Sequence, residues 1–375
     1  MSSFGRDDRS VLSVWWWTVD RWTMLALTLL LLIGAVLTLA ASPAVAERIG
    51  LESFHFVRHQ LLFMPLALAL MIGVSLLSPL GVRRLAATGF LFGLLLLAVT
   101  LIAGTEVKGA TRWIGLLGGL SLQPSEFVKP VFAVVIAWMF SEQRKRAGFP
   151  GNAVAIALLV VVAGLVAMQP DFGMAMTITV VWLIQFFLAG LPLAWVALIL
   201  GLGVGAAVLA YAVMPHVTSR IDRFLDPSAG DSYQIERSID AFNHGGLIGV
   251  GPGDGVVKEI LPDAHTDFIF AVAGEEFGLL LCLFMVGLFG FIVLRGLTRV
   301  LAETNLFVLL AVSGILAQFG LQALINMGVT LNLLPAKGMT LPFVSYGGSS
   351  LLAVALGMGM VLALTRRRPG EGSGR

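Results

Sequence analysis

Long apolar runs are the feature that most constrains this chain, because they recur along almost its whole length. A helix needs about 20 mainly apolar residues to cross the hydrocarbon core of a membrane. Ten stretches approach or reach that length with few charges, so the sequence predicts an all-α polytopic membrane protein with about ten transmembrane helices. The predicted spans are 22–41, 59–77, 84–104, 125–140, 152–168, 172–190, 192–213, 267–294, 306–327 and 340–364.

The composition also favours a membrane protein over a soluble domain. Of the 375 residues, 58% are hydrophobic and only 12% are charged, and the mean hydropathy is +0.93. A soluble domain carries about 25% charged residues. The single cysteine, Cys282, excludes an intrachain disulfide framework and a cysteine-based metal cluster. The first apolar run is long enough to span and many others follow it, so a cleavable signal peptide is not expected.

The distribution of basic residues predicts the orientation of the spans. Segments 1–21 and 366–375 are expected to be cytoplasmic tails around a single membrane domain, 22–365, because cytoplasmic segments carry an excess of Lys and Arg. Tryptophans 15–17 and Trp22 would then anchor the chain at the cytoplasmic interface. The basic residues assigned to the cytoplasm are Arg6, Arg9, Arg21, Arg83, Arg84, Arg144, Lys145, Arg146, Arg295, Arg299, Arg366, Arg367, Arg368 and Arg375. Those assigned to the short outer loops are Arg48, Arg58, Lys108, Arg112 and Lys337.

This topology places two long segments outside the membrane, 105–124 and 214–266. The second connects the seventh and eighth spans and is the largest polar segment of the chain. Long polar loops on a rigid scaffold are where function tends to lie. Its glycine-rich stretch, 245–255, would allow tight turns and close approach of the backbone to a ligand. A flexible loop explains the same glycines equally well.

Ionisable residues near membrane depth need a partner, a cavity or a function. Glu126 and Lys129 lie three residues apart at the start of a span, which predicts a mutual ion pair. Asp171 begins another span, where it could cap the helix or serve a functional role. Glu275 and Glu276 lie deeper in the eighth span and would need a basic neighbour or a protein-lined cavity.

Asp267 is the candidate general base. It lies where the long outer segment enters the eighth span, and Thr266 or Asp263 could cap a helix that has Asp267 in its first turn. Apolar residues follow at once, so the carboxylate would face the boundary between water and hydrocarbon. Partial burial there would raise its pKa and suit it to proton abstraction.

Metal-ligand spacing is not convincing anywhere in the sequence. The five histidines are scattered, and His55 and His59 have no acidic partner motif between them. A zinc site is therefore not predicted. No cofactor is evident, and although Mg²⁺ or Mn²⁺ is possible, the sequence identifies no ligand set for it.

Six segments carry short polar motifs: 108–114, 123–129, 169–173, 222–227, 261–276 and 334–350. Together with the ten-span topology, these segments resemble the SEDS family (shape, elongation, division and sporulation). The forms Lys-Gly-Met-Thr-Leu-Pro-Phe and Lys-Gly-Ala-Thr-Arg-Trp are more similar to its cell-division branch, FtsW, than to its elongation branch, RodA. The family's essential outer aspartate corresponds to Asp267, its Gln-Pro-Asp aspartate to Asp171, and its Arg-Trp loop to Arg112 and Trp113.

The resemblance implies a peptidoglycan glycosyltransferase, a hexosyltransferase that joins lipid II into glycan strands. It further implies a bacterial inner (cytoplasmic) membrane location at the division septum, with both termini in the cytoplasm. The implied partners are lipid II, a class B penicillin-binding transpeptidase of the FtsI type, other membrane proteins of the division complex and membrane lipid, with no role for nucleic acid.

The expected mechanism is an inverting single displacement with Asp267 as the base. Undecaprenyl pyrophosphate would leave, and positive charge would stabilise it as it departs. The candidate cations on the predicted outer side are Lys108, Arg112, Arg220, Arg223 and Lys337.

Two alternatives remain open at this stage. A lipid II flippase would also have many spans with charges at membrane depth, but it should have a polar path through the bilayer midplane. Here the ionisable residues cluster near the predicted outer face, which favours chemistry there. A non-catalytic scaffold for the transpeptidase would tolerate loss of the Asp267 carboxylate, whereas an enzyme would not.

Overall fold

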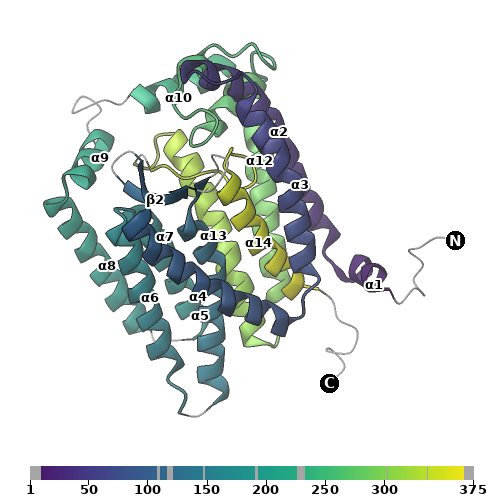
Figure 1. Cartoon of the computed structure of the whole chain (residues 1–375), viewed down its shortest axis with the longest axis vertical. Coiled ribbons are helices and arrows are strands. Elements are labelled where there is room, and N and C mark those ends of the chain that lie inside the picture. The colour runs from purple at the N-terminus through teal and green to yellow at the C-terminus, as the bar shows by residue number, and fades with distance from the viewer. Residues whose placement is uncertain are drawn as a thin grey trace.

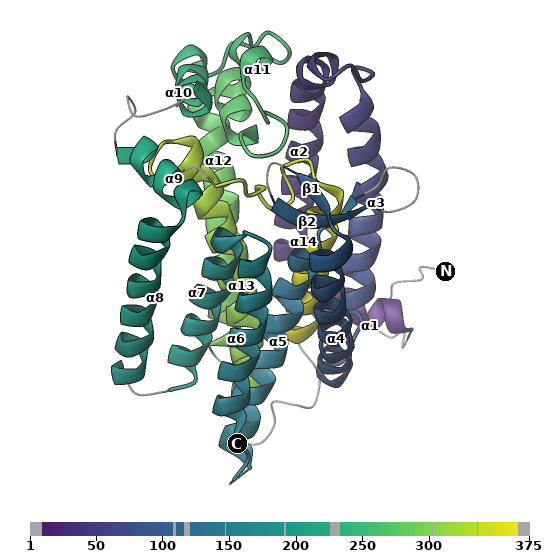
Figure 2. The same cartoon turned by 60° about the vertical axis from the view of Figure 1, so that its left-hand side comes forward.

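The computed structural model describes residues 10–107, 110–115, 121–146, 148–190, 193–225, 233–301, 303–335 and 337–366. The molecule is a bundle of long helices with a small sheet and several short helices gathered at one end (Figures 1 and 2). We call this the sheet end. Within the described residues, seven helices are long and apolar enough to cross a membrane. They are α2 (Arg21–Arg48), α3 (His55–Ser75), α4 (Pro79–Ala103), α5 (Pro124–Lys145), α6 (Gly151–Met168), α12 (Ile269–Val300) and α13 (Leu306–Thr330).

Three further apolar helices complete the bundle. They are α7 (Phe172–Leu188), α8 (Leu193–Val213) and α14 (Gly348–Leu364). Each of the ten predicted spans coincides with one of these ten helices, so the predicted fold class is confirmed. Helices α5 and α13 form the centre of the bundle. In their most apolar 18-residue stretches, 83% and 67% of the residues are buried inside the protein. Both contact α7 and α14.

The start of the eighth predicted span differs from expectation. Helix α12 begins at Ile269, and its N-cap, Phe268, makes no capping side-chain hydrogen bond. Neither Thr266 nor Asp263 caps the helix. Instead, Asp263 has a positive φ of 54°, and its carbonyl accepts the amide hydrogens of Thr266, Asp267 and Phe268. Asp267 therefore lies in a tight turn before α12 and not in its first turn.

The tenth predicted span also starts too early, at 340. Residues Leu341 to Ser345 form a turn in which Phe343 has a φ of 64°. The Ser345 hydroxyl accepts the amide hydrogen of Leu341 at 2.8 Å and donates to the Thr266 carbonyl. The turn is buried, so its apolar residues resemble a span in sequence although helix α14 begins only at Gly348.

The two predicted outer segments contain regular structure. Residues 105–122 include a three-stranded antiparallel arrangement of β1 (Thr105–Val107), β2 (Ala110–Gly115) and β3 (Ser121–Leu122), in that order. The second segment contains α9 (Pro215–Leu225), α10 (Tyr233–Gly245) and α11 (Val257–Ile260). Figure 2 shows α10 and α11 over the same end of the bundle as β1 and β2.

The glycine-rich stretch packs against the beginning of α12. The amides of Val250 and Gly251 donate to the carbonyls of Glu275 and Glu276 at 3.0 and 3.1 Å. A Cβ on Gly249, which has a φ of 82°, would lie 2.1 Å from the Glu276 carbonyl oxygen. Gly245 and Gly249 therefore allow close contact between two backbones of this chain, which explains these two glycines better than a flexible loop does.

The N-terminal tryptophans lie on α1 (Val11–Thr18) and at the start of α2. Trp15 is buried and donates from Nε1 to the Ser75 hydroxyl at 2.8 Å. Trp17 and Trp22 are 41% and 63% exposed, as expected of residues at a membrane interface.

Candidate functional site

A group of charged side chains lies at the sheet end, where α5 and α7 begin. The first pair is Glu126 and Lys129 of α5, whose Oε2 and Nζ atoms are 2.7 Å apart and whose side chains are only 8% and 2% exposed. The predicted ion pair is therefore present. Lys129 also donates to the amide oxygen of Gln322 on α13 at 3.0 Å, and Gln322 donates in turn to the carbonyl of Thr340 at 3.0 Å. These bonds join α5, α13 and the segment before α14.

Asp171 caps a helix, which is one of the two roles considered from the sequence, and it also forms an ion pair. Its Oδ1 accepts the amide hydrogen of Met174 at 3.1 Å and caps α7. Its Oδ2 lies 3.3 Å from Nη1 of Arg112 on β2. Trp113 follows on the same strand, where its carbonyl accepts a hydrogen bond from the Thr105 hydroxyl. The Asp171 carboxylate thus connects the small sheet to the start of α7.

Lys337 lies in the connection between α13 and α14, and its side chain extends to the start of α7. Its ammonium donates to the Gly173 carbonyl and, at 3.0 Å, to the Thr177 hydroxyl. Burial lowers the pKa of Lys337 to about 7, although the negative charges of Asp171 and Glu126 oppose this shift. A buried lysine with a nearby carboxylate is typical of functional sites.

Asp267 lies half-buried beside the same connection. The amide nitrogen of Asn326 on α13 donates to the Asp267 carbonyl at 2.8 Å and to the Met339 carbonyl at 2.6 Å. A Cβ on Gly338 would lie 3.0 Å from Oδ2 of Asp267. The Asp267 carboxylate therefore faces the backbone that follows Lys337, and Asn326 fixes the two segments against each other.

The structure brings together most of the predicted site residues. Arg112, Asp171 and Lys337 share one cluster with the Glu126–Lys129 pair, and Asp267 lies next to the segment that carries Lys337. Arg220 and Arg223 belong to α9, which packs on α8. Lys108 lies outside the described residues.

Three buried amides on α13 were not among the site residues predicted from the sequence. Gln318, Gln322 and Asn326 are 8%, 1% and 1% exposed, and two of them hold the site together. Their spacing of four residues places them on one face of the helix. Polar side chains repeated along one face of a membrane span are a signal that could have identified them.

Glu275 and Glu276 form a second polar centre beneath the glycine-rich stretch. Glu275 is fully buried and accepts the amide hydrogens of Val256, Val257 and Lys258 at 2.7–2.8 Å. Glu276 pairs with the Lys258 ammonium. The expected basic neighbour is therefore present, and the two carboxylates hold segment 245–260 on the start of α12.

No metal centre is evident in the described part of the chain, where His, Cys, Asp and Glu side chains do not gather in threes at metal-binding distance. What the fold and site define is a multi-pass membrane protein with a buried ionic cluster and a half-buried carboxylate at one end of its helix bundle. The chain belongs to the FtsW/RodA/SpoVE family, whose model is described as a cell cycle protein and matches residues 21–369. The resemblance seen in the sequence is thus confirmed.

Relatives from two bacteria match this chain over nearly its whole length. One from Caulobacter vibrioides, named a probable peptidoglycan glycosyltransferase FtsW, is 43% identical over 369 residues and covers 98% of this chain and 94% of its own. One of the same name from Coxiella burnetii is 38% identical and covers 93% of this chain and 96% of its own.

Two solved structures share the fold. A chain studied for the structural coordination of polymerization and crosslinking by a peptidoglycan synthase complex has a TM-score of 0.75 and 29% identity. The match covers 92% of this chain and 97% of that one. The rod shape determining protein RodA of Thermus thermophilus has a TM-score of 0.69 and 28% identity, and the match covers 93% and 97% of the two chains.

Proposed function

We propose that this protein is a peptidoglycan glycosyltransferase of cell division that polymerises lipid II into glycan strands. The observation that carries this proposal is the 43% identity, over 98% of the chain, to a protein named for that activity. The site supports it independently, because a half-buried carboxylate lies next to a cluster that contains three cationic side chains. Glycosyl transfer from a lipid pyrophosphate needs both a base and positive charge.

In the proposed reaction, Asp267 takes the proton from the 4-hydroxyl of the acceptor N-acetylglucosamine. That oxygen forms a bond to the anomeric carbon of the donor N-acetylmuramic acid, while the bond from this carbon to the pyrophosphate oxygen breaks. Undecaprenyl pyrophosphate leaves with the bonding electrons. A single displacement inverts the anomeric carbon and requires one base, with no strong acid for so good a leaving group.

Arg112 is the cation of the cluster best placed to meet the pyrophosphate. Its side chain is 26% exposed, whereas Lys129 is 2% exposed and committed to Glu126. Lys337 would contribute when protonated. Lys108, Arg220 and Arg223 remain further candidates, and Trp113 would contact the substrate beside Arg112. If the pyrophosphate carries a Mg²⁺ or Mn²⁺ ion into the site, that ion would help to neutralise the negative charge of the leaving group.

The proposed setting is the bacterial inner membrane at the division septum, with the sheet end outside and both termini in the cytoplasm. The proposed partner is a class B penicillin-binding transpeptidase of the FtsI type, among other membrane proteins of the division complex. The likeness to a chain from a complex that coordinates polymerization with crosslinking supports such a partner.

The test is polymerisation of labelled lipid II by the purified protein with its transpeptidase, comparing wild type with Asp267→Asn. Loss of the base should lower the rate by about 100-fold or more. Asp254→Asn is the matched control, because Asp254 is an exposed aspartate of the segment that precedes α12. This substitution should leave the rate unchanged. If Asp267→Asn polymerises normally, the mechanism is wrong. A flippase or scaffold role would then be tested by lipid II translocation and partner activation.

A further inference from the structure

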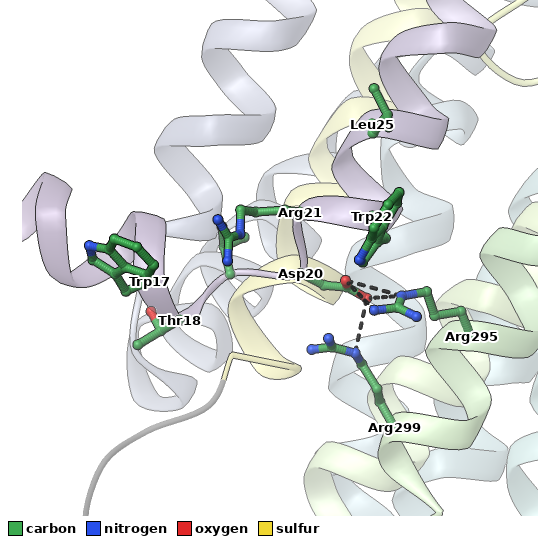
Figure 3. Close-up of a pocket in the computed structure, with 9 residues that line it drawn as sticks. Trp17, Thr18, Asp20, Arg21, Trp22, Leu25, Arg295 and Arg299 are labelled. Carbon is green, nitrogen blue, oxygen red and sulfur yellow. Dashed lines mark hydrogen bonds and ion pairs between the residues drawn. The ribbon is translucent and has the colours of Figure 1, made fainter. Parts of the chain in front are cut away.

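A cavity of about 580 Å³ lies at the end of the bundle opposite the sheet end, between the α1–α2 junction and the last turns of α12. Its size is within the range of about 300–1,000 Å³ that is usual for small-ligand sites. Figure 3 shows its lining, with Asp20 facing two arginines of α12 and with Trp22 and Leu25 following along α2. The proposed function uses none of these residues.

The polar floor of the cavity is an ion-paired carboxylate. Asp20 is 2% exposed and contacts Nε of Arg295 at 2.8 Å and Nε of Arg299 at 2.9 Å. Thr23 donates a further hydrogen bond at 2.8 Å. Burial acts to raise the pKa of Asp20, but the hydrogen bonds from Arg295 and Thr23 and the charges of both arginines hold it below the usual value. The carboxylate is therefore ionised and orients the two guanidinium groups.

The lining carries more positive than negative charge. Three arginines, Arg21, Arg295 and Arg299, accompany one carboxylate, which leaves a net charge of +2 on the lining residues. The Arg295 and Arg299 side chains are 30% and 24% exposed, so a ligand can reach them. Arg21 lies over the rings of Trp16 and Trp17 at 5.8 and 5.3 Å. A cavity of this kind suits an anion with oxygens that can accept several N–H bonds at once.

The apolar rim identifies the kind of anion. Trp17, Trp22 and Leu25 line the cavity and are 41%, 63% and 50% exposed. Helix α1, beside it, exposes Val11 and Leu12 by 71% and 55%. Exposed tryptophans and aliphatic residues at the end of membrane helices lie at the level of lipid headgroups, with the hydrocarbon on one side. An anion that enters here carries acyl chains.

We propose that this cavity binds the phosphate headgroup of an anionic phospholipid from the adjacent leaflet. Arg21 and the guanidinium nitrogens of Arg299 that do not contact Asp20 hold the phosphate. Arg295 remains paired with Asp20 through Nε and Nη2, and the acyl chains lie along Trp22 and Leu25. Zwitterionic lipids bind less tightly, because their ammonium group meets the same arginines. The bound lipid fixes the α1–α2 junction against the end of α12.

The test is native mass spectrometry of the full-length protein in neutral detergent, titrated with dioleoyl phosphatidylglycerol or dioleoyl phosphatidylcholine. Wild type should prefer phosphatidylglycerol. The single variants Arg21→Gln and Arg299→Gln should each weaken phosphatidylglycerol binding by about fivefold, and the double variant should weaken it by about 25-fold. These factors correspond to the usual contribution of one arginine near an anionic headgroup. Arg21 is exposed and takes no part in the Asp20 ion pairs. The Arg21→Gln variant leaves those pairs intact and should fold normally.

Arg84→Gln is the matched control, since Arg84 is an exposed arginine near the start of α4, outside the cavity. It should bind phosphatidylglycerol as wild type does. The proposal is overturned if wild type has no preference, or if Arg84→Gln weakens binding as much as the cavity variants. Glycerol 3-phosphate is the probe for a free phosphate. If it displaces the lipid at millimolar concentration, the cavity binds phosphate without the acyl chains and the lipid assignment is wrong.

Discussion

Lys337 and Gly173 form a contact that depends on the absence of one methyl group. A Cβ on Gly173 would lie 2.1 Å from Cε and 2.6 Å from Cδ of Lys337, which is too close for any side chain. An alanine at position 173 would therefore push the Lys337 side chain away from the Gly173 carbonyl and the Thr177 hydroxyl. The requirement arises from contact with a distant segment and not from backbone conformation, because Gly173 lies within α7.

We expect Gly173→Ala to displace the Lys337 ammonium and to lower lipid II polymerisation about as much as Lys337→Ala does. The measurement is the initial rate of glycan formation by the purified variants. Gly164→Ala is the control, because Gly164 lies within α6 and a Cβ there would meet no atom within 4 Å. An active Gly173→Ala enzyme beside an inactive Lys337→Ala enzyme would show that the lysine works from another position.

Local charge spacing predicted part of the site correctly. The Glu126–Lys129 pair and the Asp171 cap could be predicted because both partners lie within three residues of each other. The bonds from Asn326 to the carbonyls of Asp267 and Met339 could not, because they join segments 59 and 13 residues from the amide. No spacing rule covers such contacts.

Among the elements, α12 is the one most altered by its neighbours. Gly278 interrupts it with a φ of 72°, and a Cβ there would lie 2.4 Å from the Gly249 amide nitrogen. The amide of Leu279 donates instead to the Gly246 carbonyl at 3.0 Å. The glycine-rich stretch thus satisfies backbone groups at the kink. Glu275 holds residues 256–258, which directly follow this stretch.

We expect Glu275→Gln to lower the free energy of unfolding by about 2 kcal/mol, because an amide cannot accept all three backbone N–H bonds and one buried donor loses its partner. The measurement is thermal denaturation in detergent, together with limited proteolysis across 245–260. Glu259→Gln, an exposed glutamate of the same segment, should leave both unchanged. Equal behaviour of the two variants would contradict the structural role of Glu275.

The ten helices could be predicted from apolar length alone, because a membrane span must satisfy its own backbone hydrogen bonds. The beginnings of α12 and α14 could not. At 340 the apolar run continues through a turn that depends on the positive φ of Phe343 and on a side-chain bond from Ser345. Before α12, the Asp263 carbonyl gathers three amide hydrogens, and nothing in the local composition indicates that arrangement.

For the whole molecule, the two ends of the bundle differ in chemistry. The sheet end carries the ionic cluster and Asp267, while the opposite end carries Asp20, its arginines and the exposed tryptophans. The positive-inside distribution predicts that the sheet end faces outward. The single native cysteine, Cys282, is 3% exposed, so cysteines introduced at either end can be labelled with little background.

We expect Asp254→Cys to react with a membrane-impermeant maleimide in intact spheroplasts, because Asp254 is exposed in the segment before α12. Arg84→Cys, near the start of α4 at the opposite end, should react only after lysis. Wild type provides the background from Cys282. The reverse pattern would place the site in the cytoplasm and exclude polymerisation outside the membrane.

The two hydrogen bonds that the Asn326 amide donates have a consequence for genetic screens. One amide group holds the backbones on both sides of the site, those of Asp267 and Met339. In a screen for loss of cell division, substitutions at Asn326 would give the same phenotype as substitutions at Asp267. The variant protein would be stable and inserted in the membrane but inactive. Such a result would suggest a second catalytic position, although Asn326 is buried and its effect would be transmitted through the main chain.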